Sequence, residues 1–313
     1  MMMRIGSSLR QQGALLALVA ACAVASIRYE AFLTPENLMN VLRQNSMLGI
    51  MALGMTFVIL MGGIDLSAGA LLAVAGVIAA NLATSGLLAG ASAAIAATGL
   101  LGLVNGIIVT KSRVPPFIVT LATMSAARGL ALAATDEQSV GVDRAAKAFL
   151  SLGRGDLAGV PAPVIVLAAA YAIGWLVLRH TAFGRHVYAI GDNEEAARLM
   201  GLNVERITMG VYTLSGALAG LAGVILASRL GAGQPGAGAG WELDAIATVV
   251  VGGTLLTGGQ GGAGSTLVGV LLLGVVFNMF NLEGTISPWW QWVLRGLFLL
   301  TVVITQTRMR RSS

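Results

Sequence analysis

The length of the uncharged stretches constrains this chain more than any other feature of its sequence. From Leu66 to Thr110 there are 45 consecutive residues without Asp, Glu, Lys or Arg, and 38 more lie between Asp244 and Glu283. A helix needs about 20 apolar residues to cross the roughly 30 Å hydrocarbon core of a bilayer. Each stretch is therefore long enough for two membrane-spanning helices joined by a turn.

The composition also excludes a soluble globular protein. Hydrophobic residues make up 56% of the chain and charged residues 11%, against about 45–50% and about 25% in ordinary soluble domains. The single cysteine, Cys22, excludes a disulfide framework, a cysteine-based zinc site and an iron–sulfur cluster. His180 and His186 are the only histidines, so we expect no metal centre.

The uncharged intervals predict an all-α, polytopic membrane protein, with a single transmembrane domain over residues 1–313. The ten expected spans are about 12–28, 46–63, two within 66–110, 116–134, 161–178, 207–228, two within 244–283, and 289–307. The two paired stretches should turn near Ser85-Gly86 and break at Gly258–Gly264. Residues 135–160 are expected to form an outer loop, and residues 179–206 a cytoplasmic loop.

The basic residues predict the orientation of the chain. With the N-terminus in the cytoplasm, the inside loops hold eleven of the nineteen Lys and Arg residues and the clearly outside loops hold five. Such an excess marks the cytoplasmic side. We therefore expect both termini to be cytoplasmic and the protein to lie in the lipid of a bacterial inner membrane, with Trp289, Trp290 and Trp292 at the outer interface. No basic face with interleaved aromatic residues is present, which argues against a nucleic-acid partner.

The N-terminus allows two interpretations. Arg4 and Arg10 precede the apolar run Ala14–Ala25, and Val19-Ala20-Ala21-Cys22 resembles a lipoprotein cleavage box, as in a secretory signal. We favour a first transmembrane helix that stays attached, because many further spans follow.

Two glycine-containing segments resemble each other. Gly62–Gly69 and Gly252–Gly259 share four identities, and each follows an apolar run and precedes a helix of small residues. Paired glycine-interrupted segments in two halves of a chain point to a transport pathway, because broken helices present backbone polar groups at membrane depth. Chance likeness between glycine-rich turns is the alternative. The expected pathway residues are Gly62, Gly63, Asp65, Ser67, Gly253, Thr254 and Thr257.

Charged residues near or within the spans are few, and each is costly in lipid. Asp65 could act in the pathway or its gate, or Asp65 or Ser67 could cap the next helix; both readings are compatible. Glu242 and Asp244 are expected to have a capping and interface role. Arg128 could pair with an acidic group. Polar residues within apolar runs should form bonds between helices; they are Asn105, Asn278 and Asn281.

Motifs for catalysis are missing from the sequence. There is no G-x-x-x-x-G-K-[ST] phosphate loop, no G-x-S-x-G and no H-E-x-x-H. The chain is therefore not expected to be an enzyme or to bind a nucleotide cofactor by itself.

The cytoplasmic loop contains a predicted short helix over residues 192–201. Asp192 is a suitable N-cap with Glu195 three residues later, and Gly201 supplies a left-handed stop. A helix of about eight residues, roughly 12 Å long, is too short to be stable alone. It needs a surface, either on another protein or on its own bundle. The residues expected to contact another protein are Gly191, Asp192, Asn193, Glu194, Glu195, Ala196, Ala197, Arg198 and Gly201.

Three separated motifs resemble the ribose-type permease subunits of bacterial ABC sugar importers. They occur in order over nearly the whole chain: Ala52–Ser67, the loop Ala189–Gly201, and Glu242–Ala247 before Gly252-Gly253. Within that family, Asn281–Trp290 most resembles the galactofuranose permeases. Pro288, Ala68 and Asp192 depart mildly from the pattern, which leaves the sugar open.

The resemblance implies a permease subunit with a type II-like ABC importer architecture. A second permease subunit, identical or homologous, would complete the pathway, and a periplasmic sugar-binding protein would deliver a neutral monosaccharide. A separate cytoplasmic ABC ATPase would bind ATP-Mg and hold the short loop helix. The main rival is an ion-coupled secondary transporter of a small polar solute, in which Asp65 carries the coupling proton or sodium ion. A passive pore is a third possibility.

Overall fold

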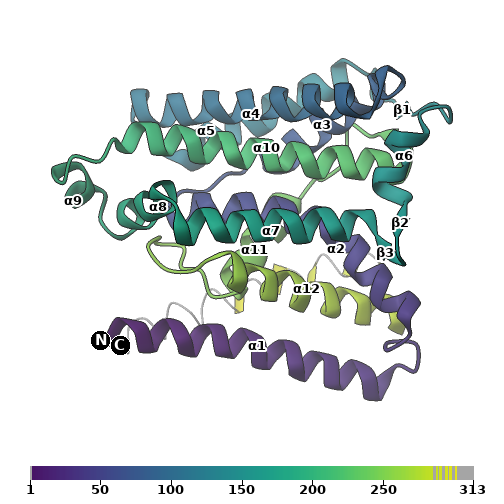
Figure 1. The fold of residues 1–313 in the computed structure, drawn as a ribbon, viewed down its shortest axis with the longest axis horizontal. Coiled ribbons are helices and arrows are strands. Elements are labelled where there is room, and N and C mark those ends of the chain that lie inside the picture. Colours follow the sequence, from purple (N-terminus) through teal and green to yellow (C-terminus); the bar gives the residue numbers. More distant parts are fainter. Residues whose placement is uncertain are drawn as a thin grey trace.

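The computed structural model describes residues 2–284, with the backbone alone for residues 2–12, and residues 287, 289, 290, 293, 294, 296, 297, 300 and 301 beyond them. Figure 1 shows an elongated bundle in which the long helices run roughly along one direction. In chain order the α-helices are α1 Met2–Arg28, α2 Pro35–Leu60, α3 Ala68–Asn81, α4 Leu87–Ser112, α5 Pro116–Ala133, α6 Lys147–Arg154, α7 Ala162–His180, α8 Ala182–Asp192, α9 Glu194–Leu199, α10 Val204–Leu230, α11 Trp241–Val251 and α12 Ala263–Glu283.

The remaining regular structure is short. A 3₁₀ turn, η1 Ala83–Ser85, joins α3 to α4. Strand β1 Val140–Gly141 pairs antiparallel with β4 Ala232–Gly233, and β2 Asp156–Leu157 pairs with β3 Val160–Pro161. Figure 1 places β1, β2, β3 and α6 at one end of the bundle, and α8, α9 and the start of α1 at the opposite end. We call these the α6 end and the α9 end. The loops expected on opposite sides of the membrane, 135–160 and 179–206, thus lie at opposite ends.

The fold class expected from the sequence is confirmed, since the protein is a polytopic helical membrane protein. Five of the described helices are long and apolar enough to cross a membrane: α4, α5, α7, α10 and α12. Two shorter apolar helices, Gly13–Arg28 within α1 and α3, accompany them. The turn expected near Ser85-Gly86 is present, whereas α11 has only 11 residues before the predicted break. The tenth expected span, 289–307, lies largely outside the described residues.

Helix α10 is the centre of the bundle and packs against α2, α3 and α4. Small residues allow this close approach, as in many membrane helix pairs. A Cβ atom on Gly216 would collide with the carbonyl oxygen of Thr98, and one on Gly223 with that of Leu72. Positions 216 and 223 therefore have no room for a larger side chain. This close packing fixes the position of α10, and with it the groups that the polar side chains of α10 can reach.

Candidate functional site

Three segments far apart in the sequence meet near the α9 end of the bundle. The amide of Gly259 donates to the carbonyl oxygen of Leu60, where α2 ends, over 2.9 Å. A Cβ atom on Gly191, at the end of α8, would collide with that same oxygen and lie 2.7 Å from the Gly259 nitrogen. A Cβ atom on Gly258 would lie 2.9 Å from the Gly62 nitrogen. We call Leu60, Gly62, Gly191, Gly258 and Gly259 the glycine junction.

The glycine junction brings together the two segments that resemble each other in sequence. Each follows the end of a helix and precedes the start of another: residues 61–67 lie between α2 and α3, and residues 252–262 between α11 and α12. Gly62 and Gly253 have φ values of +76° and +107°, a region that side chains rarely adopt. The third segment, Gly191 and Asp192, belongs to the loop that we expected to contact another protein. The expected coupling loop therefore contacts Leu60, Gly258 and Gly259, which are neighbours in sequence of the expected pathway residues Gly62 and Thr257.

Asp65 is fully buried and accepts three hydrogen bonds. Its Oδ1 accepts from the Ser67 amide over 3.0 Å and from the Ser67 hydroxyl, and its Oδ2 accepts from the Ser215 hydroxyl of α10 over 2.7 Å. Ser67 is the N-cap residue of α3 but makes no side-chain cap hydrogen bond to the helix, and Asp65 bonds the amide of Ser67 itself, so neither side chain caps the first turn of α3 in the way that the sequence predicted. Ser215 was missed, because nothing in the local pattern of α10 indicates which residue faces Asp65.

The hydrogen bonds continue from Ser67 into the neighbouring helices. The Asn105 side-chain amide of α4 donates to the Ser67 hydroxyl over 3.1 Å, and the Thr123 hydroxyl of α5 donates to Asn105. Asn278 of α12 exchanges hydrogen bonds with Asn37 of α2, at 2.8 and 3.0 Å. The predicted bonding between helices is thus confirmed for Asn105 and Asn278.

The expected pathway residues of the second segment have different environments. Thr254 is fully buried, and its hydroxyl has no hydrogen-bond partner among the described residues. It lies against Gly261, where a Cβ atom would collide with it. Thr257 is exposed, and its carbonyl oxygen lies beside Gly62. The side chains of Thr254 and Thr257 therefore do not share one environment with Asp65, although their backbone belongs to the same region.

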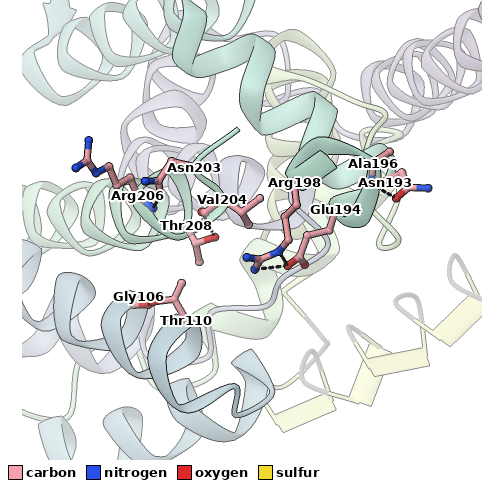
Figure 2. Close-up of polar contacts among 10 residues, drawn as sticks. All are labelled: Gly106, Thr110, Asn193, Glu194, Ala196, Arg198, Asn203, Val204, Arg206 and Thr208. Atoms are coloured by element: carbon pink, nitrogen blue, oxygen red, sulfur yellow. Dashed lines mark hydrogen bonds and ion pairs between the residues drawn. The ribbon is translucent and has the colours of Figure 1, made fainter. Parts of the chain in front are cut away.

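The short loop helix differs in detail from the prediction. Asp192 is the last residue of α8 and not an N-cap, so that expectation was wrong. Asn193 caps α9 instead, with its side-chain oxygen accepting from the Ala196 amide over 2.9 Å (Figure 2). The helix has six residues rather than about eight, because α8 extends up to Asp192. Gly201 has a φ of +82°, as expected for a left-handed stop.

Helix α9 is held on the bundle by one small side chain. Ala197 is fully buried against Ile190 of α8 and Val204 of α10. Leu199 and Met200, in contrast, are 84% and 70% exposed. Both interpretations of the loop therefore have support, since one face rests on the protein's own bundle while two large apolar side chains are mostly exposed.

Helix α8 was not predicted as a separate element. Its buried residues, Gly184, Val187 and Ile190, recur every three positions, and the Thr181 side chain accepts from the Gly184 amide at its start. This periodicity and the N-cap were available signals. The Tyr188 hydroxyl of α8 also donates to the Gly261 carbonyl oxygen over 2.8 Å, which adds a second link between the loop and the 252–262 segment.

A cavity of about 590 Å³ lies beside the glycine junction. It is bounded by the end of α2, the link between α4 and α5, helix α9 and the start of α10; its lining includes Gly62, Gly63, Glu194, Arg198, Thr208 and Tyr212. Glu194 and Arg198 form an ion pair of 2.8 Å at one wall (Figure 2). The cavity therefore connects the exposed loop helix with the first glycine-broken segment.

The segment before α11 has its own polar contacts. Glu242 Oε1 accepts from the amide of Gly240, the N-cap residue of α11, over 3.2 Å, so it lies at the helix start as predicted, while its expected interface role stays a prediction. Arg128 of α5 donates to the carbonyl oxygens of Pro235, Ala237 and Gly69, at 2.7, 2.6 and 3.3 Å. Its hydrogen-bond partners are thus backbone carbonyl groups, while the nearby carboxylate of Glu242, an acidic group as the sequence suggested, attracts it electrostatically without a hydrogen bond.

These features define a multi-pass helical membrane protein in which an exposed loop contacts two glycine-broken segments. The family model for "branched-chain amino acid transport system / permease component" matches residues 37–303, and the chain belongs to this family. The ribose import permease protein RbsC of Bacillus subtilis is 44% identical over 95% of this chain and 92% of its own length. The L-arabinose transport system permease protein AraH of Escherichia coli is 41% identical over 92% of this chain and 86% of its own length. No solved structure matches the chain.

Proposed function

We propose that this chain is the membrane-spanning permease subunit of an ATP-driven ABC importer for a neutral monosaccharide. The glycine junction is the observation that carries the proposal. It joins the end of α8, within the 179–206 loop, to the end of α2 and to the 252–262 segment through contacts that leave no space for a side chain. A force applied to the loop is therefore transmitted to both turns without first compressing flexible side chains.

The proposed partners follow from this arrangement. A separate cytoplasmic ATPase binds ATP-Mg and docks on the exposed tip of α9, where Leu199 and Met200 are available. A second permease subunit completes the pathway, and a periplasmic sugar-binding protein delivers the substrate. The α9 end, with the start of α1, then faces the cytoplasm of a bacterial inner membrane. This orientation agrees with the excess of basic residues in the loops at that end.

The proposed mechanism is alternating access. ATP binding draws the ATPase subunits together and moves α9, and the turns at Gly62-Gly63 and 252–262 change their packing against each other. Nucleotide drives this change only if it binds the two states with different affinity. Gly63, Ser67, Gly253, Thr254 and Thr257 remain the proposed pathway residues beside Gly62 and Asp65.

The substrate class rests on the relatives. Their names specify ribose and L-arabinose, which makes these pentoses the first sugars to test. Galactofuranose, suggested by the resemblance of Asn281–Trp290, is a further candidate. Ligand binding by the sugar-binding protein that works with this permease, measured by calorimetry, decides among the three.

Reconstitution tests the proposed energy source. Proteoliposomes that contain the permease, its ATPase and the binding protein should accumulate sugar with ATP, and those without the ATPase should not. Uptake in the absence of the ATPase, driven by a proton or sodium gradient, would instead identify an ion-coupled transporter. Leakage without either energy source would identify a passive pore. The three hydrogen bonds to Asp65 come from Ser67 and Ser215, so the carboxylate is already engaged within the protein, which favours a structural role over ion coupling.

A further inference from the structure

A tyrosine hydroxyl buried beside the glycine junction has no hydrogen-bond partner among the described residues, and the same is true of the Thr254 hydroxyl. Tyr212 of α10 is 3% exposed, and its hydroxyl makes no hydrogen bond within the described part of the chain. Burying an unpaired hydroxyl is unfavourable, whereas Phe in the same place would supply the ring without this cost. Packing alone therefore does not account for a tyrosine at position 212.

The surroundings of this hydroxyl are those of the predicted pathway. A Cβ atom on Gly63 would lie 2.7 Å from the hydroxyl oxygen, so glycine at position 63 leaves the space that the hydroxyl needs. Ser215, three residues later on α10, donates to Asp65. The same stretch of α10 thus presents two hydroxyl groups to residues 63–65, of which one is used within the protein and the other is not.

Tyr212 also lines the cavity of about 590 Å³, together with Gly62, Gly63 and Thr208. Most of the charges in this lining are compensated: Glu194 pairs with Arg198, and Glu205 pairs with Lys111 over 2.7 Å, while Arg113 is exposed. The interior of the cavity therefore offers hydroxyl, backbone and apolar groups. Such a lining suits a neutral solute that carries several hydroxyl groups.

We infer that this cavity is a solute-binding site on the α9 side of the pathway and that the Tyr212 hydroxyl binds a hydroxyl group of the transported sugar. The inference rests on the proposed function. In the conformation described here Gly63 covers the hydroxyl, so a shift of the Gly62-Gly63 turn is what exposes it to the solute. The phenolic hydroxyl can both donate and accept, which matches the hydroxyl groups of a monosaccharide.

Tyr212→Phe tests the inference in the complete importer, with the ATPase and the binding protein, using ribose at saturating concentration. The variant should fold with an unchanged or higher thermal midpoint, and ATP-driven uptake should fall about two- to tenfold, as expected for one lost uncharged hydrogen bond. Deoxy analogues of ribose should identify the hydroxyl that is bound. The wild type should transport the analogue that lacks this hydroxyl more slowly than ribose. Tyr212→Phe should transport that analogue and ribose at the same rate.

Tyr171→Phe is the matched control. The Tyr171 hydroxyl is buried too, but it donates to the Gly49 carbonyl oxygen over 3.0 Å. This variant should lower the thermal midpoint and leave the discrimination between ribose and its deoxy analogues unchanged. If Tyr212→Phe also lowers the thermal midpoint and leaves this discrimination unchanged, the Tyr212 hydroxyl has a structural role and the inference is wrong. If the wild-type importer moves no sugar at all, the proposed function itself fails.

Discussion

Asp65 shows how a single carboxylate is accommodated among membrane helices. It is fully buried, and all three of its hydrogen bonds come from Ser67 and Ser215. Two of these bonds lie within the turn after α2, just before α3 begins, and the bond from Ser215 ties that turn to the middle of α10. The side chain therefore fixes the turn at residues 61–67 rather than one helix alone.

Substitutions at Asp65 separate hydrogen bonding from charge. Asp65→Asn keeps an acceptor for Ser67 and an amide that can donate to Ser215, so we expect a stable protein with most of its transport rate. Asp65→Ala leaves several buried polar groups unpaired, at about 1–3 kcal/mol each. It should lower the thermal midpoint strongly. Complete loss of transport in a well-folded Asp65→Asn variant would show that the negative charge itself is required.

Gly191 is the residue at which the loop touches both glycine-broken turns. In Gly191→Ala the added Cβ atom would collide with the Leu60 carbonyl oxygen, so the contact must separate. We expect ATP hydrolysis to continue while sugar uptake falls at least about tenfold, because a separated contact transmits less movement. Both rates should be measured in the same proteoliposomes.

Gly264→Ala provides the control for Gly191→Ala. No atom lies within 4 Å of a Cβ atom at position 264, and the residue is in the first turn of α12. Alanine should be neutral or stabilise the helix by roughly 0.5–1 kcal/mol. Equal uptake by the two variants would mean that the close contact at Gly191 has no part in coupling.

At the scale of the elements, α9 is a short helix with an exposed tip. Its six residues are held by the Asn193 cap, the buried Ala197 and the Glu194–Arg198 ion pair, which is itself exposed and contributes little. The tip residues Leu199 and Met200 contribute little to packing, because most of their surface is exposed. An element of this kind is suited to contact another protein.

Replacing both tip residues with serine should leave the fold intact and weaken ATPase binding. For Leu199→Ser with Met200→Ser we expect an unchanged thermal midpoint and a loss of about 2 kcal/mol or more in affinity, since two apolar side chains no longer become buried at the interface. Pull-down of the ATPase with the detergent-solubilised permease measures the effect. Normal recovery of the ATPase would place its docking surface elsewhere.

Arg128 makes side-chain contacts that help to hold the segment before α11. Arg128 donates to three carbonyl oxygens, two in the Pro235–Ala237 stretch and one at Gly69 of α3. Arg128→Lys keeps the charge but not the planar arrangement of donors. We expect a lower thermal midpoint and faster proteolysis between residues 234 and 240. A midpoint equal to that of the wild type would show that these bonds are replaced by water.

At the scale of the whole molecule, the bundle has two different ends. The α6 end carries the short strands and the ion pair between Arg43 and Asp156, and the α9 end carries the glycine junction and the exposed loop. Helix α10 extends between them and contacts α2, α3 and α4 over much of its length. It is therefore the element that connects the Asp65 network to the rest of the fold.

The sequence alone determined the class of protein and most of the helix positions. Uncharged stretches of this length must form helices, because only a helix satisfies its own backbone groups in lipid. The same reasoning placed the turn near Ser85-Gly86 and the loop around residues 179–206. The N-cap of α9 was misplaced by one residue, since Asp192 and Asn193 are both suitable caps and only the end of α8 decides between them.

Only the tertiary structure decided which distant residues meet. Leu60, Gly191 and Gly259 come together because α2, α8 and the turn before α12 pack at one end of the bundle, and no local pattern records that packing. The partners of Asp65 and the unpaired hydroxyl of Tyr212 have the same origin. Periodicity and charge specify which segments enter the membrane, whereas the close approach of small residues specifies how those segments face one another.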